Sequence, residues 1–224
     1  KPFLERRFDI EPVAGGADPP RAWRVLGIAN AEQHASPFVS RVREISVLED
    51  LLQQVEEGSG QAVLVAGDPG IGKTRLLHEF HRRTGARAAW LQGSAVSFGG
   101  SWPVHPLIDL LKHAFAIQSG DSDEVIGERI AAATAALDEG YRPSVPFLRS
   151  LLSIDAGDSS VAQTDPKLRR AGIFEAVTRY LHAASRERPL IVVLEDLQWV
   201  DAATGEFLAM MTENLISDRI LLCA

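Results

Sequence analysis

Hydrophobic residues change their spacing several times along this chain, and the changes mark a series of secondary-structure elements. Four amphipathic helices are predicted from apolar side chains that recur every three or four residues after Ser40, Lys73, Asp165 and Asp201. Short apolar runs between them predict strands at 61–66, 87–91, 190–194 and 220–223. Strands and helices therefore alternate, and this order is typical of an α/β fold with a mostly parallel sheet.

The segment between the second and third of these strands is long and mainly helical. A Gly- and Ser-rich stretch predicts a loop over 92–103. Helices are expected at 106–115 and 123–137, with a shorter one at 143–152, and a polar loop is expected over 153–165. Asp165 followed by Pro166 is a good start for the next helix, with aspartate as the N-cap and proline in the first turn.

The first 37 residues differ from the rest. Two short strands are predicted at 8–10 and 23–28, separated by a loop rich in Pro and Gly, and a polar linker follows at 29–37. Two strands cannot bury a face of their own, so 1–28 is expected to be the tail of an upstream domain, and 38–224 is expected to be a domain of its own. The sequence begins with Lys1 instead of methionine, and we expect it to be an excised or processed piece.

Composition narrows the class of protein further. The chain has 224 residues, of which 46% are hydrophobic, so it can bury a sizeable core. Its one cysteine, Cys223, excludes an internal disulfide or a cysteine-based zinc site, which fits a cytoplasmic location. The net charge is −7 without a basic stripe, so no direct contact with nucleic acid is expected. The longest apolar runs are far below the roughly 20 residues that a membrane span needs.

The strongest chemical signal is the segment from Gly67 to Thr74, which reads Gly-Asp-Pro-Gly-Ile-Gly-Lys-Thr. It fits the Walker A pattern and lies between a predicted strand and a predicted helix. Glycines let the backbone curl so that successive N–H groups face phosphate oxygens, and the helix N-terminus adds a partial positive charge. We expect Asp68, Pro69, Gly70, Ile71 and Gly72 to line the nucleotide phosphates, Lys73 to reach the β and γ phosphates, and Thr74 to bind Mg²⁺.

The second signal is a buried strand that ends in two acids, Glu195 and Asp196. Downstream of a Walker A segment this is the Walker B arrangement, in which one acid serves the metal and the other polarises the attacking water. The simplest assignment gives Glu195 the metal and Asp196 the water, and the reverse assignment stays open. Both acids are therefore candidate metal ligands and candidate catalytic residues, together with Lys73.

Other side chains give weaker signals. His78 and His81 are three residues apart on one helix without a suitable carboxylate and are expected at the surface, and His105 and His113 have no partner by sequence. Trp199 is expected to be a core or interface anchor, with a wall of the nucleotide site as the second interpretation. Arg169 and Arg170 are expected in solvent, and a role as γ-phosphate sensor is the alternative.

Three segments resemble the ATPase module of bacterial STAND-type signalling proteins, within the AAA+-like P-loop class. They are Phe38-Val39-Ser40-Arg41 with Glu44 and Leu48, the segment 67–74, and the run Leu-Glu-Asp-Leu-Gln-Trp-Val-Asp at 194–201. The segment 98–106, with Trp102-Pro103, is also similar. The resemblance implies that Val39 and Arg41 contribute to the nucleotide site, where Ser40 replaces the usual glycine near the adenine.

The resemblance also implies an architecture and a role. The expected fold is a three-layer α/β/α P-loop NTPase with strand order 5-1-4-3-2. In this order 220–223 would be strand 4, and strand 5 and the helical lid are expected to be absent from this sequence. Similar modules lie beside class III nucleotidyl cyclase domains or in LuxR-type transcription regulators. Residues 1–27 of this chain resemble the closing strands of such a cyclase domain.

The function expected is Mg·ATP binding and slow hydrolysis as a regulatory switch. It would act on neighbouring domains of a larger signalling protein. Nucleotide-dependent self-association is a further hypothesis. An AAA+ motor or loader and a nucleotide-binding scaffold without turnover are the alternatives. Intact Lys73, Thr74, Glu195 and Asp196 argue against the scaffold.

Overall fold

A computed structural model describes residues 8–12, 23–28, 41–96, 103–135, 139–154 and 159–224. The chain divides into two compact units, 1–42 and 43–224. In the first unit, strands β1 (Phe8–Pro12) and β2 (Trp23–Ile28) pair in antiparallel fashion, with an irregular register between Asp9 and Ile10. Both strands lie where the alternating pattern predicts them.

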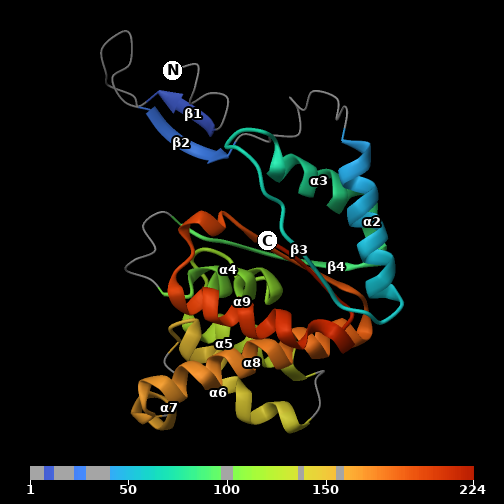
Figure 1. The fold of residues 1–224 in the computed structure, drawn as a ribbon. Coiled ribbons are helices and arrows are strands. Elements are labelled where there is room, and N and C mark those ends of the chain that lie inside the picture. Colours follow the sequence, from blue (N-terminus) through green and yellow to red (C-terminus); the bar gives the residue numbers. More distant parts are fainter. Residues whose placement is uncertain (1–7, 13–22, 29–40, 97–102, 136–138, 155–158) are drawn as a thin grey trace. The chain divides into compact units, whose positions relative to one another are not determined.

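The second unit is built around a parallel sheet of four strands in its described residues (Figure 1). The strands are β3 (Gln61–Val63), β4 (Ala89–Ser94), β5 (Leu190–Glu195) and β6 (Ile220–Cys223). Their spatial order is β3-β6-β5-β4, and every neighbouring pair is parallel. The last strand therefore lies between the two that carry the motifs, which confirms the predicted P-loop NTPase order for these four strands.

Helices cover both faces of this sheet. On one face, α2 (Val42–Glu56) and α3 (Lys73–Thr84) bury Leu52 and Phe80 completely. On the other face, α4 (His105–Ala114), α8 (Pro166–Glu187) and α9 (Ala202–Asn214) form one hydrophobic cluster with the inward residues of β5 and β6. Side chains alternate along a strand, so β5 buries residues on both faces and reads as a continuous apolar run.

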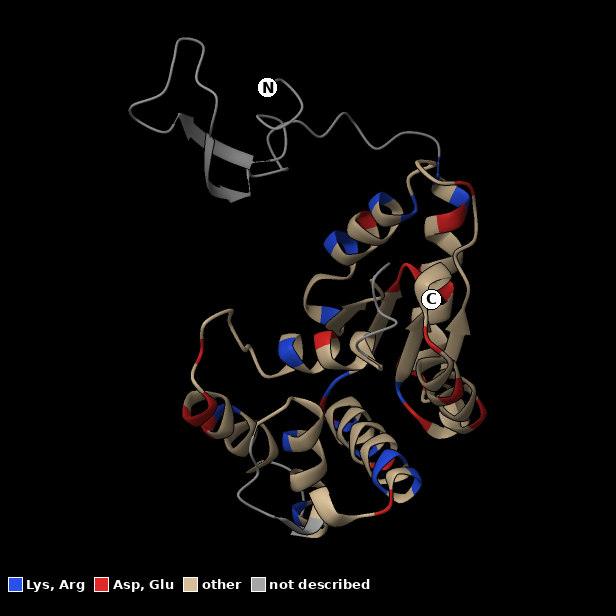
Figure 2. Cartoon of the chain, turned by 90° about the vertical axis from the view of Figure 1, so that its left-hand side faces the viewer, with Lys and Arg blue, Asp and Glu red and all other residues tan. Residues whose placement is uncertain are grey.

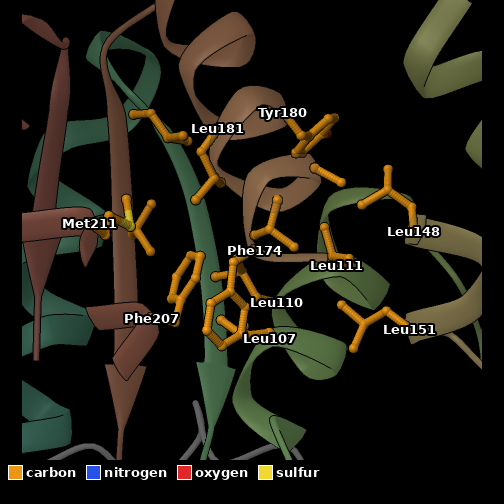
Figure 3. Packing of buried hydrophobic residues seen from close by; sticks show 14 of the residues in the cluster. Leu107, Leu110, Leu111, Leu148, Leu151, Phe174, Tyr180, Leu181, Phe207 and Met211 are labelled. Atoms are coloured by element: carbon orange, nitrogen blue, oxygen red, sulfur yellow. The ribbon is translucent and has the colours of Figure 1, made fainter. Parts of the chain in front are cut away.

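A further layer of helices lies against α4 and α8. It contains α5 (Asp123–Ala135), a 3₁₀ turn (Glu139–Ser144), α6 (Val145–Leu151) and the short α7 (Ser159–Gln163). Leu148 and Leu151 of α6 join the same core as Leu107, Leu110 and Leu111 of α4 (Figure 3). This core continues to the sheet through the rings of Phe174 and Phe207, which meet edge to face with centroids 5.4 Å apart.

Three predicted boundaries differ from the structure. Strand β4 extends to Ser94, although Gln92, Gly93 and Ser94 were expected in a loop, because its backbone pairs with β5 as far as Glu195. Strand β3 is shorter than predicted and ends at Val63, although the N–H of Val65 still donates to the carbonyl of Ala224. Helix α7 forms inside the predicted loop 153–165.

Capping and charge follow the sequence pattern closely. Asp165 and Asp201 are the N-caps of α8 and α9, and each side chain accepts hydrogen bonds from two backbone N–H groups in the first turn. Lysine and arginine outnumber the acidic residues on α3 and on α8. Figure 2 shows that helices of the chain carry both signs of charge. No helix within the described ranges combines the length and the hydropathy that crossing a membrane requires.

Candidate functional site

The Gly-rich loop connects β3 to α3 and is exposed from Gly67 to Ile71. Gly70 and Gly72 have φ values of 79° and 95°, in the left-handed region where any side chain would be strained. Residues 68–71 form a turn, in which the N–H of Ile71 donates to the carbonyl of Asp68 over 3.3 Å. These conformations explain why the loop has glycine at both positions, and they curl the backbone ahead of the helix.

Lys73 spans the inside of this curl. Its ammonium donates to the carbonyl of Gly67 over 2.8 Å and to that of Asp68 over 3.2 Å. Lys73 is the first residue of α3 and Thr74 the second, so both lie where the helix presents N–H groups without partners inside the helix. The Lys73 ammonium and the first N–H groups of α3 thus lie at the same end of the helix, which suits an anion such as a phosphate.

The two acids follow directly at the carboxyl end of β5. Glu195 is the last residue of the strand and is half-buried, whereas Asp196 is exposed and has φ 61° and ψ 38°. This left-handed conformation, which aspartate tolerates better than most residues, turns the chain sharply into a 3₁₀ turn. The two carboxylates have different partners: Glu195 accepts from the side chain of Gln92 over 2.7 Å, and Asp196 from that of Gln198 over 3.0 Å.

The topology brings the loop and the acids to one end of the sheet. Strands β3 and β5 are parallel to each other and are separated by β6 alone. Carboxyl ends of parallel strands lie at the same edge, which is where open α/β sheets bind ligands. The predicted phosphate loop and the predicted acid pair therefore share that edge.

Gln92 is a site residue that sequence reasoning missed. Its side chain is on the same face of the sheet as Glu195, one strand away, and it receives a hydrogen bond over 3.4 Å from the indole of Trp90. The sequence carried little signal, because Gln92 fell in a stretch interpreted as a loop. Only the extension of β4 beside β5 makes this contact visible.

Asp201 does more than cap α9. One carboxylate oxygen accepts from the N–H groups of Ala203 and Thr204, and the other accepts from the Thr204 hydroxyl over 2.6 Å and from the N–H of Val104 over 3.0 Å. Burial raises the pKa of this carboxyl, but the hydrogen bonds from Thr204, Val104 and Ala203 outweigh it and hold the pKa below its ordinary value. The acid-bearing loop is thereby tied to the beginning of α4.

The remaining candidates have mixed outcomes. Val39 and Ser40 lie outside the described residues, and Arg41 is half-buried just before α2. Trp199 is 51% exposed in the 3₁₀ turn after the acids, so it is not a core residue. Its roles as an interface anchor or as a wall of the nucleotide site stay predictions. Arg170 lies 3.8 Å from Glu206 in an exposed ion pair. His81 stacks on Trp90 at 4.3 Å between ring centroids.

Comparison with known proteins decides the family. Residues 37–223 match the family described as AAA ATPase domain. The chain belongs to this family. ATP binding and hydrolysis are the activity of such a domain.

An uncharacterised protein of Rhizobium meliloti (strain 1021) is 32% identical to this chain over 221 residues. The match covers 94% of this chain but 21% of the relative, so the chain spans about a fifth of that protein's length. No solved structure matches the chain significantly.

The residues of this AAA ATPase domain fit Mg·ATP. The glycine curl offers backbone donors, and the Lys73 ammonium sits on two carbonyl oxygens that a phosphate could replace. The Thr74 hydroxyl and the carboxylates of Glu195 and Asp196 supply oxygen atoms, the ligand type that Mg²⁺ prefers. The donor set and the cradle are therefore suited to a magnesium nucleotide.

Proposed function

We propose that this AAA ATPase domain is a regulatory nucleotide switch: it binds Mg·ATP, hydrolyses it slowly and passes the resulting conformational change to neighbouring domains of a larger signalling protein. The observation that carries the proposal is the position of the Lys73 loop and the Glu195–Asp196 pair at one end of the sheet. The much greater length of the matched relative supports a role within a larger polypeptide.

The chain's own residues would divide the work as follows. Backbone N–H groups of 67–73 bind the phosphates, and Lys73 exchanges its two carbonyl partners for phosphate oxygens. Thr74 and Glu195 would hold Mg²⁺, which would supply charge neutralisation for the phosphates. Asp196 orients the attacking water and accepts its proton on a carboxylate oxygen, and its exposed position leaves it accessible to that water.

The acids are linked to distant parts of the fold, which supports a switch. Gln92 connects Glu195 to β4, and Asp201 connects the loop after Asp196 to the beginning of α4. A change in the orientation of either acid on hydrolysis would therefore alter contacts outside the site. Linkage to a nucleotidyl cyclase or to a transcription regulator is the wider context that we propose for the switch, with the cyclase favoured by the N-terminal strands.

Calorimetry and single-turnover phosphate release test the proposal together. Lys73→Ala should weaken ATP binding by about 1.5–3 kcal/mol, the scale of hydrogen bonds to charged groups. Asp196→Asn should keep Mg·ATP bound and stop turnover, whereas Glu195→Gln should raise the Mg²⁺ concentration needed. Exchange of these two phenotypes would swap the assigned roles.

Three results would refute the switch in this form. Equal ATP affinity in the wild type and in Lys73→Ala would reject the loop as the phosphate site. Tight binding without any turnover would identify a scaffold. Fast steady turnover that depends on ring assembly, seen by sizing chromatography with ATP, would identify a motor.

A further inference from the structure

Among the described residues, strand β4 is the outer strand of the sheet on its side, so half of its backbone groups point away from β5. Residues 89, 91, 93 and 95 face β5, as the bonds from Ala89 to Pro189 and from Ala95 to Glu195 show. The N–H groups of Gln92 and Ser94 therefore point outward. An outward N–H that lies under another element needs a partner, because leaving it unpaired is costly.

Side chains of α4 supply these partners. The N–H of Gln92 donates to Nδ1 of His113 over 3.1 Å, and the N–H of Ser94 donates to a carboxylate oxygen of Asp109 over 3.0 Å. The ring of His105 lies 3.1 Å from the carbonyl of Ser94 through its Nδ1. His105, Asp109 and His113 are spaced by four residues, so they form one stripe along the helix, which we call the α4 stripe.

Gly93 permits this close approach. A Cβ atom at position 93 would lie 2.2 Å from the carbonyl oxygen of Pro106 and 3.1 Å from the backbone nitrogen of Leu110. The first turns of α4 therefore pass directly against the strand backbone. Without that proximity, the side chains of Asp109 and His113 could not reach the outward N–H groups.

The bond from Gln92 to His113 identifies the acceptor on the imidazole. An N–H can donate to Nδ1 only through the lone pair of that nitrogen, so a replacement side chain must offer an acceptor atom at the same place to keep the contact.

We propose that His113 is a positioning residue for Glu195, acting through Gln92. The ring fixes the backbone of Gln92 from the edge of the sheet, and the side chain of the same residue holds the Glu195 carboxylate over 2.7 Å. Two hydrogen bonds thus join the surface of α4 to the proposed metal-binding acid. This inference rests on the proposed function only for the role of Glu195.

Asparagine and glutamine at position 113 are similarly polar but place their acceptor oxygen differently. Comparing them tests whether an acceptor at the place of Nδ1 is needed. The Asn oxygen lies near the place of Nδ1 and can accept from Gln92, whereas the Gln oxygen lies farther out, near the place of Nε2. His113→Asn should therefore keep the wild-type behaviour, and His113→Gln and His113→Leu should lose it. Lys112→Leu changes the exposed neighbouring residue of α4 and is the matched control.

NMR of ¹⁵N-labelled protein reads the contact directly and needs no nucleotide. In His113→Leu and His113→Gln, the Gln92 backbone amide should exchange with solvent faster and its side-chain NH₂ signal should shift. His113→Asn and Lys112→Leu should leave both signals unchanged. An unmoved side-chain signal in His113→Leu and His113→Gln would overturn the proposal, as would an Asn variant that behaves like Gln.

Kinetics then test the consequence for Glu195. We expect His113→Leu and His113→Gln to lower kcat by about threefold to tenfold, the scale of one hydrogen bond, and to raise the Mg²⁺ requirement, with KM for ATP nearly unchanged. Equal kcat and Mg²⁺ requirement in all variants would overturn the positioning role. Absence of ATP binding in the wild type would instead refute the proposed function and leave the NMR result to decide the contact.

Discussion

Asp201 is the residue whose loss should report most clearly on how the acid-bearing loop is held. Replacing it with alanine removes the N-cap of α9 and also the acceptor for the N–H of Val104, which lies 97 residues earlier in the chain. The substitution therefore breaks a local interaction and a tertiary one at the same time.

The magnitude can be worked out from these two parts. Loss of an aspartate N-cap costs about 0.5–2 kcal/mol, and about 1 kcal/mol is typical. The Val104 N–H is half-buried, so leaving it without an acceptor adds about 1–2 kcal/mol, near the low end for a buried donor. We expect Asp201→Ala to lower the free energy of unfolding by about 2–3 kcal/mol.

Urea unfolding followed by circular dichroism measures this loss as a lower midpoint with an unchanged slope. Asp165→Ala is the matched control, because Asp165 caps α8 through Lys167 and Leu168 and its side chain makes no hydrogen bond beyond that helix in the described part of the chain. It should cost only the capping part, about 1 kcal/mol. Equal losses in the two variants would refute the tertiary role of Asp201.

The effect should also depend on pH. The pKa of Asp201 is lowered in the folded state, so its charge stabilises the fold fully above the ordinary carboxyl pKa of about 4. That contribution is lost as the pH falls through the lowered folded value. The difference in unfolding free energy between wild type and Asp201→Ala should therefore shrink below about pH 4, and a constant difference down to pH 2 would contradict the assignment.

Three further substitutions and one labelling experiment have clear expected outcomes. Phe207→Ala removes a ring that is 1% exposed and should cost about 3–5 kcal/mol in urea unfolding, so a loss below 1 kcal/mol would show that the core there is not tightly packed. Gly93→Ala should destabilise by about 1–3 kcal/mol through its clash with Pro106, and a neutral effect would mean that α4 moves away easily. Gln92→Leu should raise the Mg²⁺ concentration needed for ATP turnover, and an unchanged titration would separate Gln92 from the function of Glu195. Burial raises the pKa of the Cys223 thiol to about 12, so iodoacetamide at pH 8 should label it only after unfolding, and fast labelling of the native protein would contradict its burial.

The fold was largely predictable because its signals are local. The helical spacing around Leu52 and Phe80 and the apolar run of 190–194 depend on residues close together in sequence. The aspartate caps of α8 and α9 are likewise set by their own first turns. The strand order followed only from the resemblance to P-loop proteins.

The parts that sequence reasoning missed depend on contacts between distant residues. Gln92 and Glu195 are 103 positions apart, and Asp201 and Val104 are 97 apart. A glycine between two polar residues favours a loop by composition, yet Gly93 belongs to a strand because its backbone pairs with β5, and its missing Cβ lets α4 pass against it. Such a position can be assigned only when the neighbouring elements are in place.

The α4 stripe also has a consequence for how this protein behaves at high concentration. An outer strand with unpaired N–H groups is a template for a strand of another molecule, and natural proteins protect such edges to avoid aggregation. On β4, Asp109 and His113 already occupy two outward donors, and the charged and polar stripe disfavours an incoming apolar strand. Substitutions that detach α4 should therefore reduce solubility before they unfold the sheet.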